Sequence, residues 1–415
     1  MESSTSTALN QRIAHLDIIR GFALFGIILV NMVAFQQTPF AHAMNISAEL
    51  GTLGEPLRWV LDWLVQGKFY VLFSLLFGFG FTLFIDRAQA RGASARLVFL
   101  RRTLVLMLFG FAHFMLLWAG DILLLYGLSG LFLLFWSKAS VRGLLQSAAI
   151  IAFIMYGLIW AGALASPNMP AEQLAAAQQN MQAMRDLVMQ GTAYYQGESY
   201  QALVEWRWQE FLEFGLPGLG MFPMILINML IGSAFARSGK LTTPDTEQSF
   251  FKRALVIGLV VGLPASAFFA MNAEALTPAG AMNSLNAAVM TLHHIGGLGL
   301  AIAYIALFAL GVKAANGFVI SGLAAVGKLA LTNYILQSLI FSTLFNGYGF
   351  GLYGQLALWQ LLLMAVTCFA LQLVVSRWYV QRFSYGPLEY LWRVLTYAGT
   401  KARALGAGEA ASERV

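Results

Sequence analysis

Apolar runs long enough to cross a lipid bilayer fill most of this chain, and they limit its fold more than any other feature. A helix needs about 20 mostly apolar residues to span the hydrocarbon core. The candidate runs cover residues 18–36, 66–85, 103–120, 122–137, 144–165, 216–236, 254–271, 287–312, 326–345 and 355–376. Because backbone polar groups in lipid must be paired within the protein, this pattern predicts an all-α fold, a polytopic transmembrane helix bundle of about ten spans.

The composition and the charge distribution agree with a membrane-embedded chain. The 415 residues are 59% hydrophobic and 11% charged, with a mean hydropathy of +0.70, whereas a soluble domain has about 25% charged residues. The net charge of +6 comes from basic residues scattered over short loops, so we expect no nucleic-acid partner. Since cytoplasmic loops are enriched in Lys and Arg, the distribution predicts that the N-terminus and the C-terminus are both cytoplasmic.

The predicted organisation is a single transmembrane domain over residues 1–395, followed by a disordered cytoplasmic tail at 396–415. Two connections on the external side are long, at residues 37–65 and 166–215. The first contains Trp59 and Trp63 and favours a short interfacial helix. The second is either a lid over an external cavity or an ordinary surface loop on the membrane.

Polar side chains within the apolar runs are the candidate functional groups, because an intramembrane charge is costly. Asp17 and Arg20 are three residues apart and can pair on a helix. Asn31 follows Arg20 on the same face, about 16 Å along the helix axis. These residues either line a polar cavity or act as a membrane anchor and a packing amide.

The second apolar run contains Lys68 near its external end, followed by Tyr70 and Ser74. A lysine at a cavity mouth would attract an anionic substrate. The alternative is that Lys68 extends its ammonium group to the interface and has no functional role.

The third run begins near Arg101 and Arg102 and contains His113, which lies near mid-membrane on the same helix face as Arg102. Histidine is the usual general base near neutral pH, so His113 either takes a proton in that role or makes a structural hydrogen bond within the bundle. Asp121 follows at the tip of a helical hairpin. On an ideal helix it would lie about 12 Å from His113, so we expect no direct contact without a bend.

Two later runs also carry polar groups. Adjacent helical residues point about 100° apart, so at most one of His293 and His294 faces a cavity squarely. No carboxylate stands at helical spacing from them, and we predict no metal site. Lys328 precedes a run in which two pairs are each one turn apart, Asn333 with Gln337 and Tyr334 with Ser338. Such residues either line a cavity or stabilise a helix interface.

Five sequence blocks together resemble the YeiB family of bacterial inner-membrane proteins. The blocks are Leu16-Asp17-x-x-Arg20-Gly21, Gly67-Lys68-Phe69-Tyr70, Gly120-Asp121-Ile122-Leu123, Leu331-Thr332-Asn333-Tyr334 and Gly386-Pro387-Leu388-Glu389. The resemblance implies a multi-pass protein of the bacterial inner membrane. That family looks related to transmembrane acyltransferases, namely a lysosomal glucosaminide N-acetyltransferase and the bacterial sugar O-acyltransferases.

The resemblance implies acyl transfer across the membrane. An acyl-CoA, as donor rather than as permanent cofactor, would dock from the cytoplasm against Arg20, Arg101 or Arg102. The acyl group would pass to a hydroxyl or amine of a small-molecule or glycan acceptor. Asn31 stands where the O-acyltransferases carry a functional His, so His113 would take the acceptor's proton. Tyr70, Asn31 or Asn333 would then donate hydrogen bonds to the developing oxyanion.

Two other functions fit the same residues. A solute transporter or permease would also use polar groups within the bundle, helices interrupted by Gly and Pro, and an external lid. A non-catalytic membrane scaffold would tolerate the loss of Lys68, His113 and Lys328.

Overall fold

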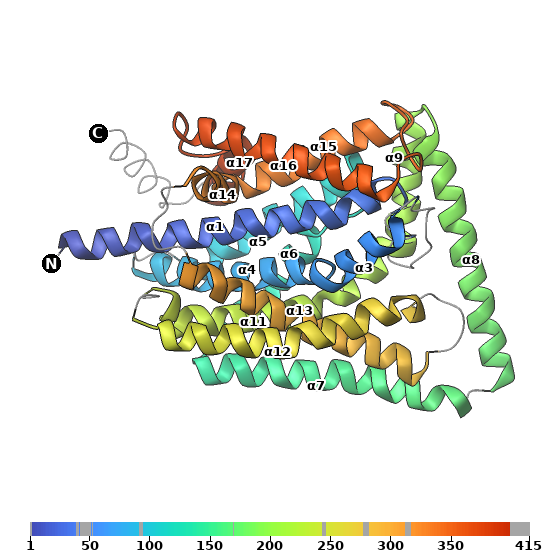
Figure 1. Cartoon of the computed structure of the whole chain (residues 1–415), viewed down its shortest axis with the longest axis horizontal. Coiled ribbons are helices and arrows are strands. Elements are labelled where there is room, and N and C mark those ends of the chain that lie inside the picture. The colour runs from blue at the N-terminus through green and yellow to red at the C-terminus, as the bar shows by residue number, and fades with distance from the viewer. Residues whose placement is uncertain are drawn as a thin grey trace.

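A computed structural model shows the protein as a bundle of helices (Figure 1). The structure describes residues 2–38, 41, 51, 53–90, 94–168, 170–242, 246–276, 282–311 and 317–398, and within these ranges it contains no strand. The predicted tail at 396–415 lies, from residue 399 on, outside the described residues.

The main helices are α1 (Glu2–Phe35), α3 (Gly54–Leu64), α4 (Lys68–Ala90), α5 (Ala95–Leu116), α6 (Leu123–Leu133), α7 (Val141–Ala165), α8 (Ala171–Gln196), α9 (Tyr200–Glu210), α10 (Leu216–Gly218), α11 (Phe222–Ser238), α12 (Gln248–Asn272), α13 (Ser284–Gly311), α14 (Phe318–Lys328), α15 (Ala330–Phe345), α16 (Leu358–Val380) and α17 (Pro387–Tyr397). A π-helical turn covers Phe211–Gly215, and short 3₁₀ turns cover Leu134–Trp136, Ser166–Asn168, Leu219–Met221, Lys240–Thr242 and Ala273–Leu276.

Eight helical segments in the described part of the chain are long and apolar enough to cross a membrane. They match eight of the predicted runs. The run at 326–345 is instead part of a pair of helices, α14 and α15, bent by 88° at their junction, which would count as a ninth span. The run at 122–137 forms a shorter apolar helix over Leu123–Trp136.

Two of the spans extend beyond the predicted runs. Gly54–Gln89 is a helical segment of 36 residues and Tyr200–Ser238 one of 39 residues. At 1.5 Å per residue the longer is about 58 Å, nearly twice the thickness of a hydrocarbon core. The predicted external connections therefore contribute helix to these spans. Helix α3 belongs to the Gly54–Gln89 segment and packs against α12, with Trp63 Nε1 donating to Leu263 O at 3.0 Å, and its place at the membrane interface stays a prediction.

The helices are arranged so that the start of α1 and helix α17 lie at one end of the bundle, and α3, α8 and α9 at the other (Figure 1). We call these the α17 end and the α8–α9 end. Helix α8 runs across its end of the bundle, roughly perpendicular to the other helices. The charge distribution predicts that the two terminal helices lie at the same end. That this end faces the cytoplasm remains a prediction.

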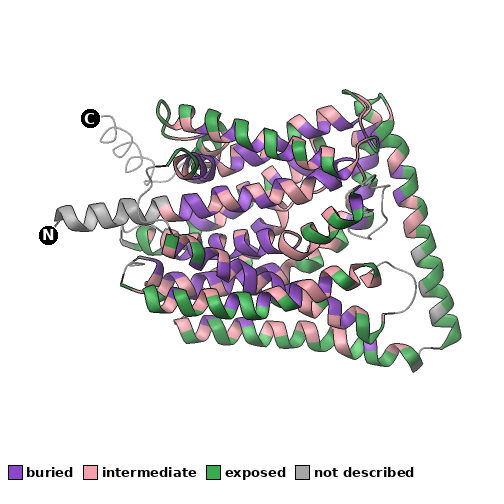
Figure 2. Cartoon of the chain, viewed as in Figure 1, coloured by how far each residue is buried: buried purple, intermediate pink, exposed green. Residues whose placement is uncertain are grey.

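The outer helices expose apolar side chains, whereas the buried residues gather in the centre (Figure 2). On α7, for example, Phe153 is 81% exposed and Leu158 is 70% exposed. Soluble proteins rarely expose large contiguous apolar surfaces. This surface is therefore suited to lipid.

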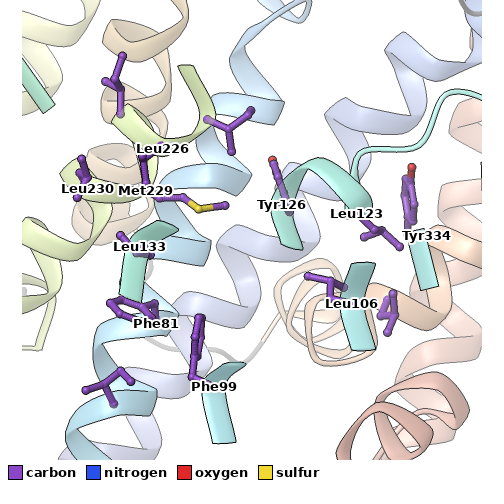
Figure 3. Packing of buried hydrophobic residues seen from close by; sticks show 14 of the residues in the cluster. Phe81, Phe99, Leu106, Leu123, Tyr126, Leu133, Leu226, Met229, Leu230 and Tyr334 are labelled. Atoms are coloured by element: carbon purple, nitrogen blue, oxygen red, sulfur yellow. The ribbon is translucent and has the colours of Figure 1, made fainter. Parts of the chain in front are cut away.

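Small residues let the central helices approach closely. A Cβ added to Gly78 of α4 would lie 1.9 Å from Met229 O of α11, and one added to Gly232 of α11 would lie 1.9 Å from Leu75 O. Ser233 Oγ also donates to Gly78 O at 2.9 Å. Next to this contact, Met229 and Leu230 belong to a large cluster of buried side chains that extends to α5, α6 and α15 (Figure 3).

Candidate functional site

The candidate site begins at the end of α5, where the chain reverses. The carbonyl oxygen of His113 accepts hydrogen bonds from the backbone of both Leu117 and Trp118, each at 2.9 Å, and these bonds end the helix. Gly120 then packs against the Trp118 indole. The contact requires glycine, because a Cβ at this position would lie 2.3 Å from the indole. The reversal brings Asp121 back toward the last turn of α5.

Asp121 contacts His113 directly. The distance between Asp121 Oδ2 and His113 Nδ1 is 2.8 Å, and both side chains are 1% exposed. An ideal helix would not allow this contact, and it forms because α5 ends at Leu116 and the chain bends before Asp121. The other carboxylate oxygen, Oδ1, accepts from Leu124 N at 2.8 Å at the start of α6. Asp121 therefore ties the imidazole to the following helix.

The second ring nitrogen of His113 contacts α15. Its Nε2 lies 2.8 Å from Ser338 Oγ, and Ser338 is 1% exposed. A carboxylate can only accept, so Nδ1 carries the proton and donates to Asp121, which leaves Nε2 as the acceptor for the Ser338 hydroxyl. The order Ser338, His113, Asp121 is that of the catalytic triad of serine hydrolases. We call these three residues the His113 site.

Aromatic side chains surround the His113 site. The Tyr334 ring lies 5.1 Å from the His113 ring, and Tyr334 OH lies 3.4 Å from Gly120 O. The Trp118 ring lies 6.4 Å from His113, and its buried Nε1 has no hydrogen-bond partner among the described residues. This unsatisfied N–H donor is available to a bound group.

Helix α9 covers the site at the α8–α9 end. Arg207 is fully buried and donates to Met115 O at 3.3 Å and to Leu117 O at 2.7 Å. Tyr200 OH donates to Leu116 O at 2.7 Å. The last carbonyl groups of a helix have no partner within it, and here α9 supplies the partners. The cover thus also stabilises the chain reversal that places Asp121.

The predicted residues Asn333 and Gln337 face away from His113. Asn333 Nδ2 donates to Ser376 Oγ at 3.1 Å, and Gln337 Nε2 donates to Gln372 Oε1 at 2.8 Å, both on α16. Helix α15 therefore has two polar stripes. Tyr334 and Ser338 meet His113, whereas Asn333 and Gln337 join α15 to α16.

A second polar cluster lies on α4, α6 and α11. Ser74 Oγ and Tyr126 OH both donate to Tyr70 O, at 2.7 and 2.9 Å, and Tyr70 OH lies 3.7 Å from Met224 Sδ. Figure 3 shows Leu123 between Tyr126 of this cluster and Tyr334.

His294 and Lys68 belong to a third buried region. His294 Nδ1 lies 2.5 Å from Tyr156 OH, and its Nε2 lies 3.0 Å from Asn228 Oδ1. His293 instead packs against Phe269, with ring centroids 3.9 Å apart. Lys68 is fully buried and donates to Asp62 O at 2.6 Å. It therefore does not extend its ammonium group to the surface.

The remaining predicted cations lie toward the α17 end. Arg20 NH1 pairs with Asp17 Oδ1 at 2.7 Å, and exposed Lys328 lies close enough to Asp17 to interact electrostatically. Arg102 lies 3.6 Å from the centre of the Trp392 ring. Arg101 NH1 donates to Ala398 O at 2.9 Å. Arg102 and His113 are eleven residues apart on α5, which places their backbones about 16 Å apart along the helix axis.

Asn31 of α1 is partly exposed and has no side-chain hydrogen bond within the described residues. The structure therefore joins His113 with Asp121, Asp17 with Arg20, and Tyr70 with Ser74, but it does not bring all predicted residues into one pocket. Three partners were missing from the predicted site, namely Ser338, Tyr156 and Asn228. Two of them had a signal in the sequence, namely the one-turn spacing of Ser338 from Tyr334 and the position of Asn228 within the apolar run at 216–236.

Residues 235–399 match a family described as "Protein of unknown function (DUF418)". The uncharacterized protein YxaH of Bacillus subtilis (strain 168) is 29% identical over 421 residues, which cover 96% of this chain and 97% of that protein. An uncharacterized 39.9 kDa protein of Bacillus acidopullulyticus is 28% identical, over 94% of this chain and 95% of its own length. No solved structure matches the chain.

The uncharacterized protein YeiB of Escherichia coli (strain K12) is 30% identical over 403 residues, which cover 93% of this chain and 96% of YeiB. The similarity extends over nearly all of both chains, including α5, α6 and α15. With its apolar helices, the chain therefore belongs to the YeiB family of multi-pass membrane proteins.

Proposed function

We propose that the protein is a membrane-embedded acyltransferase whose general base is His113. The observation that carries this proposal is the hydrogen-bonded order Asp121, His113, Ser338. A carboxylate that orients a histidine toward a hydroxyl increases the nucleophilicity of that hydroxyl. General-base catalysis of this kind contributes about 10²- to 10⁴-fold in rate.

The burial of the site supports transfer rather than hydrolysis. The side chains of His113 and Asp121 are each 1% exposed, and Ser338 is also 1% exposed. Water that is excluded from a site cannot compete with an acceptor for the acyl group. A buried hydroxyl activated by histidine is therefore suited to a transferase.

The cations at the α17 end would hold the donor. Arg20, Arg101 and Arg102 suit the phosphates of an acyl-CoA, which the resemblance to transmembrane acyltransferases implies as the donor. From Arg102 the acyl group would reach about 16 Å along α5 to His113. The acceptor, a hydroxyl or amine of a small molecule or glycan, would enter from the α8–α9 end. The bacterial inner membrane is the proposed location.

The experiment is an assay of CoA thiol release by the purified protein in nanodiscs, with acetyl-CoA as the probe donor. The His113→Gln variant is expected to lose at least about 100-fold in rate. His293→Gln is the matched control, because His293 packs on Phe269 away from the site, and it is expected to keep the wild-type rate. Unchanged thiol release in His113→Gln would overturn the proposal.

The broken helix pair supports a second candidate, solute transport. Helices α14 and α15 meet at a bend of 88°, and transporters bind substrates at such discontinuous helices. At this break the Glu389 carboxylate accepts from Thr332 N, at the N-terminus of α15. Transport predicts uptake of a solute into proteoliposomes without release of CoA thiol, and the acyltransferase proposal predicts the reverse.

A further inference from the structure

We propose that Ser338 is the nucleophile of the His113 site and carries the acyl group as an ester between the two halves of the transfer. The inference rests on the proposed function and adds to it a covalent intermediate. It also assigns a catalytic role to a residue outside the set predicted from the sequence.

The acceptor nitrogen of His113 already has a partner. Ser338 Oγ is hydrogen-bonded to Nε2 at 2.8 Å, and Asp121 is hydrogen-bonded to Nδ1 at the same distance. An acceptor that used His113 directly would first have to displace Ser338. Ser338 itself needs no displacement, because its hydroxyl already lies within reach of the base.

Buried serines of the bundle differ in whether they bond to their own helix. A serine within a helix can donate to the carbonyl four residues earlier. Ser74, Ser129 and Ser342 do so at 2.7, 2.8 and 2.5 Å, whereas Ser233 donates to Gly78 O of another helix. For Ser338 the corresponding distance, to Tyr334 O, is 3.4 Å. Its hydroxyl is therefore directed to His113 in preference to its own helix.

An unsatisfied hydrogen-bond donor lies beside the site. Trp118 Nε1 is buried and has no hydrogen-bond partner among the described residues, although its ring lies next to that of His113. Burying an N–H group without a partner costs about 1–3 kcal/mol. A donor of this kind can stabilise the oxyanion that forms when a hydroxyl attacks an acyl carbonyl.

In the first half of the transfer, Ser338 Oγ attacks the thioester carbonyl carbon and its proton passes to His113 Nε2. Asp121 stabilises the imidazolium by its charge. The C–S bond breaks, and the departing thiolate takes the proton from His113. This leaves an ester on Ser338 and a free thiol.

In the second half, the acceptor hydroxyl or amine attacks the ester carbonyl and gives its proton to His113. The bond between Ser338 Oγ and the acyl carbon breaks, and Ser338 takes the proton back. No oxidant or reductant is needed. Because the three side chains are nearly fully buried, each reactant must enter by movement of the groups that cover them.

The test uses the full-length protein in nanodiscs, mixed with radiolabelled acetyl-CoA and quenched in acid. We expect a protein-bound label at Ser338, located by mass spectrometry, and its loss in Ser338→Ala together with at least about a 100-fold loss of acyl transfer. Ser342→Ala is the matched control. Ser342 lies one turn further along α15 and donates to Ser338 O rather than to His113, so this variant should keep both the label and the rate.

Ser338→Cys supplies a signature that a structural role would not produce. A cysteine nucleophile would form a thioester, which neutral hydroxylamine cleaves, whereas the serine ester should require alkaline hydroxylamine. Size-exclusion profiles and thermal unfolding of all variants identify any that fail to fold.

The outcomes separate the two proposals. Acyl transfer at the wild-type rate in folded Ser338→Ala would overturn the covalent role and leave the proposed function standing. Absence of CoA release from the wild type, with no label on the protein, would overturn both. A label on another residue that persists in Ser338→Ala would also overturn the assignment of Ser338.

Discussion

The carboxylate of Asp121 holds the imidazole of His113 at 2.8 Å across a reversal of the chain. The same carboxylate accepts from the backbone of Leu124, so one side chain fixes both the start of α6 and the orientation of the histidine. The position of the base therefore depends on how two helices are joined.

Replacing this carboxylate tests the orientation of His113. In Asp121→Asn the amide can donate to Nδ1, which would move the ring proton to Nε2 and remove the acceptor for Ser338. We expect acyl transfer to fall by about 10²- to 10⁴-fold, measured as CoA thiol release. The control is Asp186→Asn, an exposed position on α8. A wild-type rate in folded Asp121→Asn would contradict the role of the pair.

The indole of Trp118 can be tested without loss of its ring packing. Trp118→Phe keeps an aromatic ring beside His113 but removes the unsatisfied N–H. We expect a loss of about 10²- to 10³-fold in transfer rate, as for removal of one oxyanion donor, with no decrease in thermal stability. Trp208→Phe, at a position that is 49% exposed on α9, serves as the comparison. Equal rates for the two variants would show that Trp118 donates to no reacting group.

Arg207 is expected to stabilise the cover of the site. Arg207→Met would leave the carbonyl groups of Met115 and Leu117 without their partner, at a cost of about 1–3 kcal/mol each. We therefore expect a lower unfolding temperature in detergent and reduced acyl transfer. The control Arg142→Met changes an exposed residue at the start of α7. If both variants unfold at the same temperature as the wild type, the α9 contacts do not stabilise the bundle.

Glu389 of α17 caps the N-terminus of α15. Its carboxylate accepts from Thr332 N at 3.0 Å and from Thr332 Oγ1 at 2.5 Å. Loss of a helix cap costs about 0.5–2 kcal/mol, so Glu389→Ala should lower the unfolding temperature. Glu198→Ala, at an exposed position before α9, should leave it unchanged. A transporter that requires Glu389 would instead lose uptake without losing stability.

The orientation in the membrane can be measured with single cysteines in a Cys368→Ala background. Ser94 precedes α5, and Glu198 precedes α9 at the opposite end of the bundle. The charge distribution predicts that a membrane-impermeant maleimide labels Glu198→Cys in intact spheroplasts, but labels Ser94→Cys only after permeabilisation. The reverse pattern would mean that both ends of the chain are external.

The helical class could be predicted from the sequence because the thickness of a bilayer sets the length of an apolar run, which is a local property. Residues 122–137 and 326–345 were harder to predict. In the first, the helix is short. In the second, the chain bends at Leu329, inside a run that is long enough to be predicted as one continuous helix.

The candidate site was only partly predictable. His113 and Asp121 stood out as polar residues among apolar ones, but their contact depends on where α5 ends. Ser338 meets His113 across 225 residues of sequence. Whether the Tyr334 stripe or the Asn333 stripe of α15 would face His113 is decided by the packing of α15 between its neighbours, and helical spacing alone does not contain that information.

The glycine contacts between α4 and α11 restrict how the bundle can move. With Gly78 against Met229 O and Gly232 against Leu75 O, no layer of side chains separates the two backbones, and sliding would drive one main chain into the other. Helices α4 and α11 therefore form a rigid pair. A movement that admits a reactant to His113 therefore has to involve other helices, which contact this rigid pair through flexible side chains.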